Sequence, residues 1–498
     1  MNESAGRLST GDLEALVTAL PRLDDRVDDR ERIDQLALLE RAKAALAAAQ
    51  VRVTAALVRS QEQVAAEWRE RARECSDRGD FDGWRAARDQ ARRASVPDEA
   101  VSGPRGGRSE RRPRGPRAGT GIAAQVALAR RESPTQGARH LNLALTLTGQ
   151  MPHTLAALEA GELTEWRAML IVRETAVLTP EQRTVVDAQI AGPLADQGER
   201  LGSLGDRELV RRVQAIAYRI DAASVVARSR RAESDRRVTT RPAPDTMAYL
   251  TALLPVAQAV AVQASLTVAA DTARAAGDAR SKGQVMADTL VTRVTGQSTA
   301  EAVPVEVQLV MTDRALLAGD DTPAQLTGYG TVPASWARDL LTTSAPADSA
   351  SAAARAWLRR LYTHPADGTL VAMDSTRRVF DGALRRYLVT RDAGTCRTPW
   401  CDAPIRHLDH VVEHAAGGPT HADNGQGLCV RCNHAKQHPG WHARTLPPGI
   451  GRSRRRHTVE TTTPTGHTYA STAPPLVPGL ATAPPSALER HLLSVLAA

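Results

Sequence analysis

Apolar residues recur every three or four positions along much of this chain. Between residues 31 and about 92 this spacing predicts a long helical region, and its apolar stripe consists of Ile33, Leu36, Leu39, Ala42, Leu46, Ala49, Val53 and Leu57. A stripe of this kind is stable when it packs against other helices. We therefore expect this region to be a helical scaffold.

Further helices are predicted by their start and stop signals. Ser133, followed by a proline and by Gln136, is typical of a capped helix start, and Gly149 predicts the end of that helix. Thr179 repeats the same start signal, and Gly161 predicts a turn between two other helices. The first two thirds of the chain are therefore expected to be mainly helical.

Signals for strands are few. Residues 303–311 alternate apolar and polar side chains, and hairpins are predicted around residues 242–245 and 464–466. Arg280, Gln284 and Asp288 share one predicted helix face, either as a polar site or, as is commoner, as a surface hydrogen-bond ladder.

Composition agrees with a helical protein of two or three domains. The chain has 498 residues, of which 42% are hydrophobic, and it contains only two phenylalanines, so Ala, Leu and Val must build the cores. The net charge is +8, and lysine occurs only at positions 43, 282 and 436. Arginine without lysine is typical of a GC-rich coding sequence, which is the first explanation for this bias. A basic chain also favours an anionic partner, without identifying it.

No targeting or membrane segment is expected. The most apolar window begins at Met247 and is interrupted by Pro255, Gln258 and Gln263, which favours a buried helix over a membrane span. We therefore expect a cytoplasmic protein with no membrane partner. In that reducing compartment, clustered cysteines bind metal more often than they form disulfides.

Residues 95–121 differ from the rest of the chain. They are rich in Pro and Gly, and six arginines between residues 105 and 117 are balanced by Glu110 alone. This predicts a disordered basic linker, which is either a flexible arm for nucleic-acid phosphates or a solvated insertion.

The expected domains follow from these changes along the chain. A strongly basic helix begins at Asp374, and Trp400 and Trp441 are expected to pack the following small module against it. The predicted boundaries are 1–94 for N-terminal helices, 95–121 for the linker, 122–345 for a helical domain with a short sheet, 374–445 for the small module, and 446–498 for a hairpin and Pro-rich tail.

Four of the five cysteines fall into two pairs within the small module. Cys396 and Cys401 form the first pair, and Cys429 and Cys432 form the second. A closed set of four thiolates is the ligand set of structural zinc. Asp409 and His410 lie between the pairs, and they can serve one site only if the predicted strand ends or twists there.

This stretch resembles the zinc-knuckle variant of the His-Asn-His (HNH) nucleases. The matching positions are Cys396, Cys401, Asp409, His410, Gly417, Gly418, Thr420, Asn424, Cys429, Cys432, Asn433 and Lys436. Four upstream stretches, residues 126–147, 151–168, 242–255 and 280–296, resemble the domain of unknown function 222, the 13E12-repeat family of actinobacteria. That resemblance covers roughly residues 30–340, and this domain usually precedes an HNH module. The implied fold class is a mainly α N-terminal domain plus a small C-terminal α+β module with a zinc-knuckle ββα-metal fold.

The resemblance to HNH nucleases implies roles for individual residues. His410 would be the general base, Asn424 would brace the loop, and Asp409 and Asn433 would hold a catalytic Mg²⁺ or Mn²⁺. His434 would replace Asn433 as a ligand if the helix register were shifted by one. The implied substrate is DNA, whose phosphates would be contacted by Lys436, Arg431, Arg385 and Arg386, although a solvated helix face would have the same composition. The alternative is a catalytically inactive zinc-knuckle module that binds nucleic acid.

Overall fold

The computed structural model describes residues 8–94, 120–192, 201–297, 309–317, 319–326, 329–343, 380, 382–447 and 456–475. These residues form two compact units. The first takes its described residues from 8–57 and 142–222, and the second takes the others. The predicted arm between Arg105 and Arg117 and the start of the basic helix at Asp374 lie outside the described residues.

The first unit is helical. Its elements are α1 (Thr10–Ala19), η1 (Leu20–Arg22), the start of α2 (Asp29–Asp77), the end of α5 (Pro134–Gln150), α6 (Pro152–Glu159), α7 (Glu165–Glu174), α8 (Pro180–Ile190), η3 (Leu201–Ser203) and α9 (Asp206–Ile220). The capping box of Thr179 and Gln182 at the start of α8 confirms the predicted signal, as does the left-handed Gly161 between α6 and α7. Leu147, Ile171 and Leu209 are fully buried in its core.

The predicted apolar stripe on α2 is wrong in its register. Leu36 and Val53 are 62% and 69% exposed, whereas Ala48 and Val51 are 1% and 4% exposed. Small side chains let neighbouring backbone come close, and a Cβ added at Gly161 would meet the Cβ of Arg41 at 2.9 Å. The long helical region is also divided, because α2 ends at Asp77 and α3 (Phe81–Ala94) begins after a turn with a left-handed glycine.

The second unit contains the remaining helices and all the described strands. Before the small module these are the end of α2, α3, α4 (Thr120–Arg130), the start of α5, α10 (Ala222–Ala232), η4 (Glu233–Asp235), β1 (Arg237–Pro242), β2 (Ala248–Leu253), α11 (Val256–Ala275), α12 (Lys282–Thr295), β3 (Leu309–Val310), α13 (Asp313–Leu317), β4 (Ala324–Leu326), β5 (Gly330–Val332) and α14 (Ala334–Thr343). The predicted hairpin is confirmed, since β1 pairs with β2. Of predicted strand 303–311, residues 303–308 lie outside the described part.

The polar ladder predicted at Arg280 has structural partners. Arg280 donates to Asp288 at 2.7 Å, and Gln284 completes a capping box with Ser281 at the start of α12. These bonds account for all three polar residues, so they form a helix cap and an ion pair.

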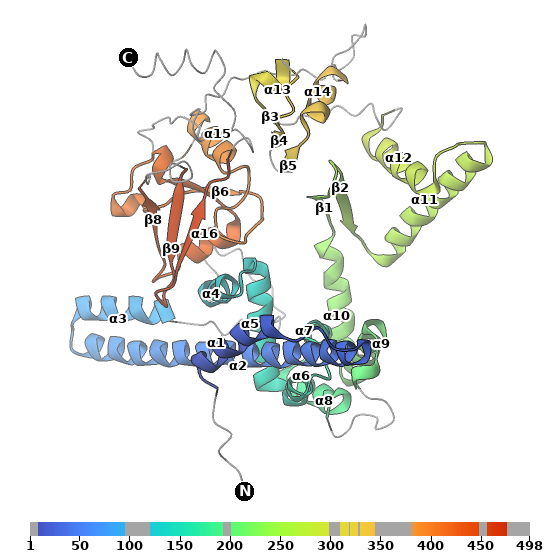
Figure 1. Ribbon diagram of the computed structural model, residues 1–498. Coiled ribbons are helices and arrows are strands. Elements are labelled where there is room, and N and C mark those ends of the chain that lie inside the picture. Colours follow the sequence, from blue (N-terminus) through green and yellow to red (C-terminus); the bar gives the residue numbers. More distant parts are fainter. Residues whose placement is uncertain are drawn as a thin grey trace, which may run out of the picture. The chain divides into compact units, whose positions relative to one another are not determined.

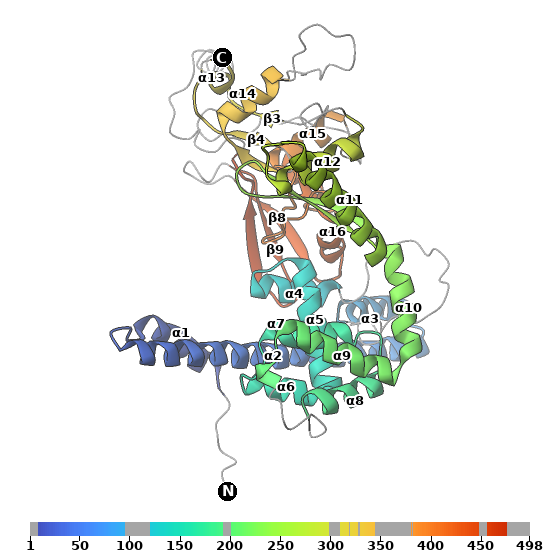
Figure 2. The ribbon, with the colours of Figure 1, turned by 90° about the vertical axis from the view of Figure 1, so that its right-hand side faces the viewer.

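The small module contains two antiparallel sheets and two helices. Its elements are α15 (Gly382–Arg391), β6 (His407–His410), η6 (His414–Ala416), η7 (Ala422–Asn424), β7 (Gly425–Leu428), α16 (Val430–Lys436), β8 (His442–Leu446), β9 (Thr458–Thr462) and β10 (Thr468–Thr472). Strand β6 pairs with β7, and β9 lies between β8 and β10 (Figures 1 and 2). The predicted C-terminal hairpin is thus confirmed by β9 and β10. The same sheet includes β8, which crosses the predicted domain boundary after residue 445. The chain is mostly helical with small antiparallel sheets near its C-terminus.

Helix α4 packs against the small module. Ala124 and Leu128 of α4 form one apolar cluster with Ala435 of α16 and Trp441, and Figure 1 shows α4 next to the module. The expectation that Trp441 packs against the basic helix is therefore wrong. Helix α15 instead packs through two leucines onto Phe380 and Ala422.

Candidate functional site

The four paired cysteines lie together in the small module. The first pair follows α15, and the second pair stands at the start of α16, where Cys429 is the N-cap. All four side chains are buried, and their sulfur atoms lie within 4.8 Å of one another. The folding of α16 onto the β6–β7 pair therefore brings the two knuckles together.

The sulfur geometry fits a tetrahedral metal ion. Zn–S bonds of about 2.3 Å in a tetrahedron place the sulfur atoms about 3.8 Å apart, and Cys401 Sγ and Cys429 Sγ are 3.7 Å apart. All four cysteines are free of disulfides. The cluster can thus hold a metal ion such as zinc, and among the described residues no other group of His, Cys, Asp or Glu side chains is close enough to do so.

The thiols also perturb one another. Hydrogen bonding with Cys396 is the largest cause of two opposite shifts, since it lowers the pKa of Cys429 and raises the pKa of Cys432. One thiolate is therefore stabilised by its neighbours, and further ionisation requires a cation to balance the charge.

Strand β6 ends at the two residues expected to carry the chemistry. Asp409 lies opposite Gln426 and His410 lies opposite Gly425 in the antiparallel register. Successive side chains of a strand point to opposite faces, so Asp409 faces α16 while His410 faces the ring of Phe380, 4.5 Å away. Strand β6 ends at His410. This meets the condition under which Asp409 and His410 could serve one site.

His410 is held from two sides. Its Nε2 lies 2.8 Å from the Thr420 hydroxyl in a hydrogen bond, and its ring stacks at a tilt on Phe380. The imidazole of His414 lies edge-on at 5.6 Å between ring centroids. These contacts fix the plane of the His410 ring at the end of β6.

Asn424 closes the loop between β6 and β7. Its Oδ1 accepts from the Val412 amide at 2.8 Å, and its Nδ2 donates to the carbonyl oxygens of Val412 and Pro419 at 3.0 and 2.8 Å. The loop is so tight that a Cβ added at Gly418 would lie 2.0 Å from the Val412 carbonyl oxygen, and Gly417 takes a left-handed φ of 86°. The Gly-Gly pair is thus required by this loop.

Asn433 and Lys436 face the strands from α16. Asn433 Nδ2 donates to His407 Nδ1 at 2.7 Å, and its Oδ1 is buried without a hydrogen-bond partner among the described residues. Lys436 Nζ donates to Asp409 Oδ2 at 2.8 Å and to the His410 carbonyl oxygen at 2.6 Å. The structure thus places Asp409 with Lys436, and its Oδ2 bonds that ammonium.

The other expected phosphate contacts lie at the surface. Arg385 and Arg386 are exposed on α15, and Arg431 is exposed on α16. Lys436 differs from them, because its side chain is only 10% exposed and paired with a carboxylate. His434, the alternative ligand, is half-buried, with its ring 6.4 Å from that of His407.

Comparison with known proteins assigns most of the chain to one family. A family model described as "Domain of unknown function (DUF222)" matches residues 85–392, which is more than half of the chain. The chain belongs to this family. No curated protein and no solved structure matches it. None of the described DUF222 helices is both long and apolar enough to cross a membrane.

The DUF222 match ends at Asp392, just before the first knuckle, so the candidate site lies beyond it. The last two matched residues nevertheless form hydrogen bonds to the backbone of the candidate site. Arg391 donates to Asp392 at 2.8 Å and to the carbonyl oxygens of Ala422 and Gly425 at 2.8 Å each, while Asp392 accepts from the Gly427 amide at 2.9 Å. DUF222 thus ends in a buried ion pair that fixes β7.

Sequence reasoning missed three of these residues. Arg391, Asp392 and Arg397 are all buried. Burial lowers the pKa of Arg397 to about 10. Its guanidinium donates to the carbonyl oxygens of His457 and Ser471. The sequence signal for a structural ion pair was the adjacent Arg391 and Asp392, shortly before the first cysteine knuckle. In an arginine-rich chain this signal was hidden by the background.

Proposed function

We propose that this DUF222 protein is a metal-dependent HNH endonuclease that hydrolyses phosphodiester bonds in DNA, with His410 as general base. The observation that carries the proposal is the buried Asn433 Oδ1, which has no hydrogen-bond partner within the described residues. It lies on the helix whose Lys436 bonds the Asp409 carboxylate and the His410 carbonyl oxygen. These bonds bring the end of β6 together with the helix that carries Asn433. A ββα-metal site requires this meeting of strand end and helix.

The available donor atoms fit a hard divalent cation. Asp409 offers a carboxylate, and Asn433 offers a buried Oδ1 that lacks a hydrogen-bond partner within the described residues. His407 holds the amide nitrogen of Asn433 and thereby sets which atom of the amide is available. Such oxygen ligands favour Mg²⁺ or Mn²⁺, which would neutralise charge on the scissile phosphate and on the leaving 3′-oxygen when bound.

His410 would take the proton from the attacking water. Histidine is the side chain that most often serves as a general base in enzymes. Thr420 and Phe380 restrict rotation of the ring. Asn424 supports this indirectly, because it holds the loop that carries Thr420.

The cysteine cluster would bind structural zinc and hold the two knuckles together. It joins the turn after α15 to the start of α16, and the candidate catalytic residues lie between them in the sequence. DNA phosphates would be contacted by the exposed Arg385, Arg386 and Arg431, and these contacts would add affinity without sequence specificity.

A catalytically inactive, nucleic-acid-binding zinc module is the second candidate. The specific observation in its favour is the Lys436–Asp409 ion pair, because a carboxylate that is already neutralised has less need of a divalent ion. The presence of Asp409, His410, Asn424 and Asn433 together favours the nuclease, since a binding module needs none of these as a set.

Cleavage of supercoiled plasmid tests the proposal. Full-length protein is incubated with plasmid in Mg²⁺, in Mn²⁺, or without an added divalent ion, and the products are separated on a gel. We expect nicked or linear DNA only with a divalent ion. If plasmid, single-stranded DNA and RNA all stay intact with both ions while the protein still binds them, the inactive module is the correct interpretation.

A further inference from the structure

Lys436 is a buried cation at the place where the proposed nuclease needs a metal ion. Its side chain is 10% exposed and that of Asp409 is 20% exposed, and their charged atoms lie 2.8 Å apart. The ammonium also donates a hydrogen bond to the backbone carbonyl oxygen of His410 at 2.6 Å. It therefore already neutralises the carboxylate that a divalent ion would bind.

The residue type at this position is informative. The chain has 64 lysines and arginines, and only three of them are lysines. An ammonium is a compact point charge on a flexible stem, whereas a guanidinium is a planar fork with fixed geometry. A lysine can therefore occupy the place of a small cation and leave it again.

We propose that Lys436 is the resident counter-cation of Asp409, and that a divalent ion must displace its ammonium to bind. The inference rests on the proposed function, in which Asp409 and Asn433 hold that ion. While no ion is bound, the lysine keeps a largely buried carboxylate paired, which avoids the cost of an isolated buried charge. When an ion arrives, two cations compete for one carboxylate.

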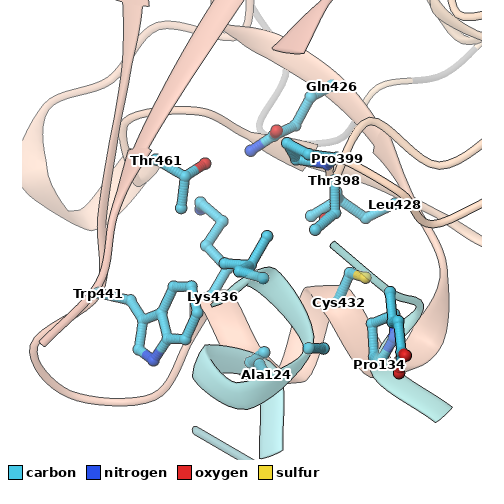
Figure 3. A pocket seen from close by; sticks show the side chains of 14 residues that line it. Ala124, Pro134, Thr398, Pro399, Gln426, Leu428, Cys432, Lys436, Trp441 and Thr461 are labelled. Carbon is cyan, nitrogen blue, oxygen red and sulfur yellow. The ribbon is translucent and has the colours of Figure 1, made fainter. Parts of the chain in front are cut away.

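The structure offers the displaced ammonium a place to go. Lys436 lines a cavity of about 30 Å³ together with Gln426, Thr398, Thr461 and Trp441. Figure 3 shows the Lys436 side chain among those that line this cavity, with the amide of Gln426 and the hydroxyl of Thr461 nearby. The lining is mainly apolar, but it includes the polar side chains of Thr398, Gln426 and Thr461. The space is about the size of one ammonium or water, so the lysine can move without unfolding α16.

This arrangement lowers the affinity for the ion. A divalent ion that bound beside an unmoved ammonium would meet a like charge a few ångströms away. An ion that displaced the ammonium must break two hydrogen bonds, of which the one to Asp409 is also an ion pair. Removing the charge of Lys436 therefore tightens binding of the ion, which is opposite to the result expected for a residue that merely supports the site.

Titration calorimetry of Mn²⁺ into zinc-loaded full-length protein without DNA tests the proposal. We expect Lys436→Met and Lys436→Gln to bind Mn²⁺ at least about tenfold more tightly than the parent. Arg431→Gln is the matched control, because it removes the same charge from the exposed side of the same helix, and its affinity should stay within about twofold. Asp409→Asn should abolish binding in both the parent and the Lys436→Met background.

The outcomes separate the two proposals. If both Lys436 variants keep their zinc and fold and bind Mn²⁺ as the parent does or more weakly, Lys436 is not a competitor of the ion. If the variants bind more tightly but neither they nor the parent cut any nucleic acid, the lysine proposal holds and the nuclease proposal fails. If neither parent nor variants bind Mn²⁺, the lysine proposal is overturned directly.

Discussion

Replacing Asn424 with alanine removes the side chain that ties the two ends of the β6–β7 loop together. Asn424 is 7% exposed and makes three hydrogen bonds, with the Val412 amide, the Val412 carbonyl and the Pro419 carbonyl. None of these groups is a proposed metal ligand or base. The substitution therefore perturbs the geometry of the candidate site without removing its chemistry.

The expected magnitude follows from the bonds lost. At a net value of about 1 kcal/mol each, the three hydrogen bonds contribute about 3 kcal/mol to closing the loop. That loss corresponds to a roughly hundredfold larger fraction of open loop. Asn424→Asp keeps the acceptor for the Val412 amide but turns a carboxylate toward two carbonyl oxygens, so it should open the loop at least as much as alanine does.

Hydrogen exchange measured by mass spectrometry detects this opening locally, which matters because a chain of several units has no single free energy of unfolding. We expect exchange in the peptide covering residues 411–424 to rise about a hundredfold in Asn424→Ala, while peptides from α7 stay unchanged. Asp423→Ala is the control, since that side chain is 76% exposed. Equal exchange in Asn424→Ala, Asp423→Ala and the parent would refute the assigned bracing role.

Three further predictions concern the same module. Cys429→Ser should lose zinc, measured by metal analysis, and should raise exchange throughout residues 396–441 while the first unit keeps its protection. Burial lowers the pKa of His457 to about 4, so the folded module disfavours the protonated ring and loses stability as pH falls from about 6.5 toward 4. His457→Gln should flatten this dependence, measured as the hydrogen-exchange protection of residues 456–475 at pH 7 and 5. Arg385→Gln with Arg386→Gln should weaken DNA binding for all sequences and reduce the salt slope by about two contacts, measured by fluorescence anisotropy.

Much of the architecture follows from local signals in the sequence. The capping box at Thr179 and the left-handed Gly161 confirm helix boundaries that depend on a few neighbouring residues. The cysteine cluster was also predictable, because two closely spaced cysteine pairs are typical of a structural zinc site, and their four sulfur atoms do lie together. Membership of the DUF222 family was predicted from local stretches and is confirmed by the family match.

Other features depend on contacts between distant segments. The buried face of α2 is set by small residues such as Ala48, and a periodic count of large apolar residues selects a different face. Trp441 packs on α4, more than 300 residues earlier in the chain, which no local pattern indicates. Lys436 was expected to contact phosphate, with a solvated helix face as the alternative. Helix α16 is short and packs against both strands and α4, so its last turn is buried too.

Cleavage by His410→Ala tests the central claim most directly. The substitution removes the proposed base but no cysteine ligand, and His414→Ala is the matched control, because it removes a neighbouring exposed imidazole whose ring lies 5.6 Å away. With zinc content and DNA affinity equal to the parent, we expect His410→Ala to cut supercoiled plasmid orders of magnitude more slowly in Mg²⁺ or Mn²⁺, and His414→Ala to cut at close to the parent rate. Cleavage by His410→Ala at the parent rate would contradict the account.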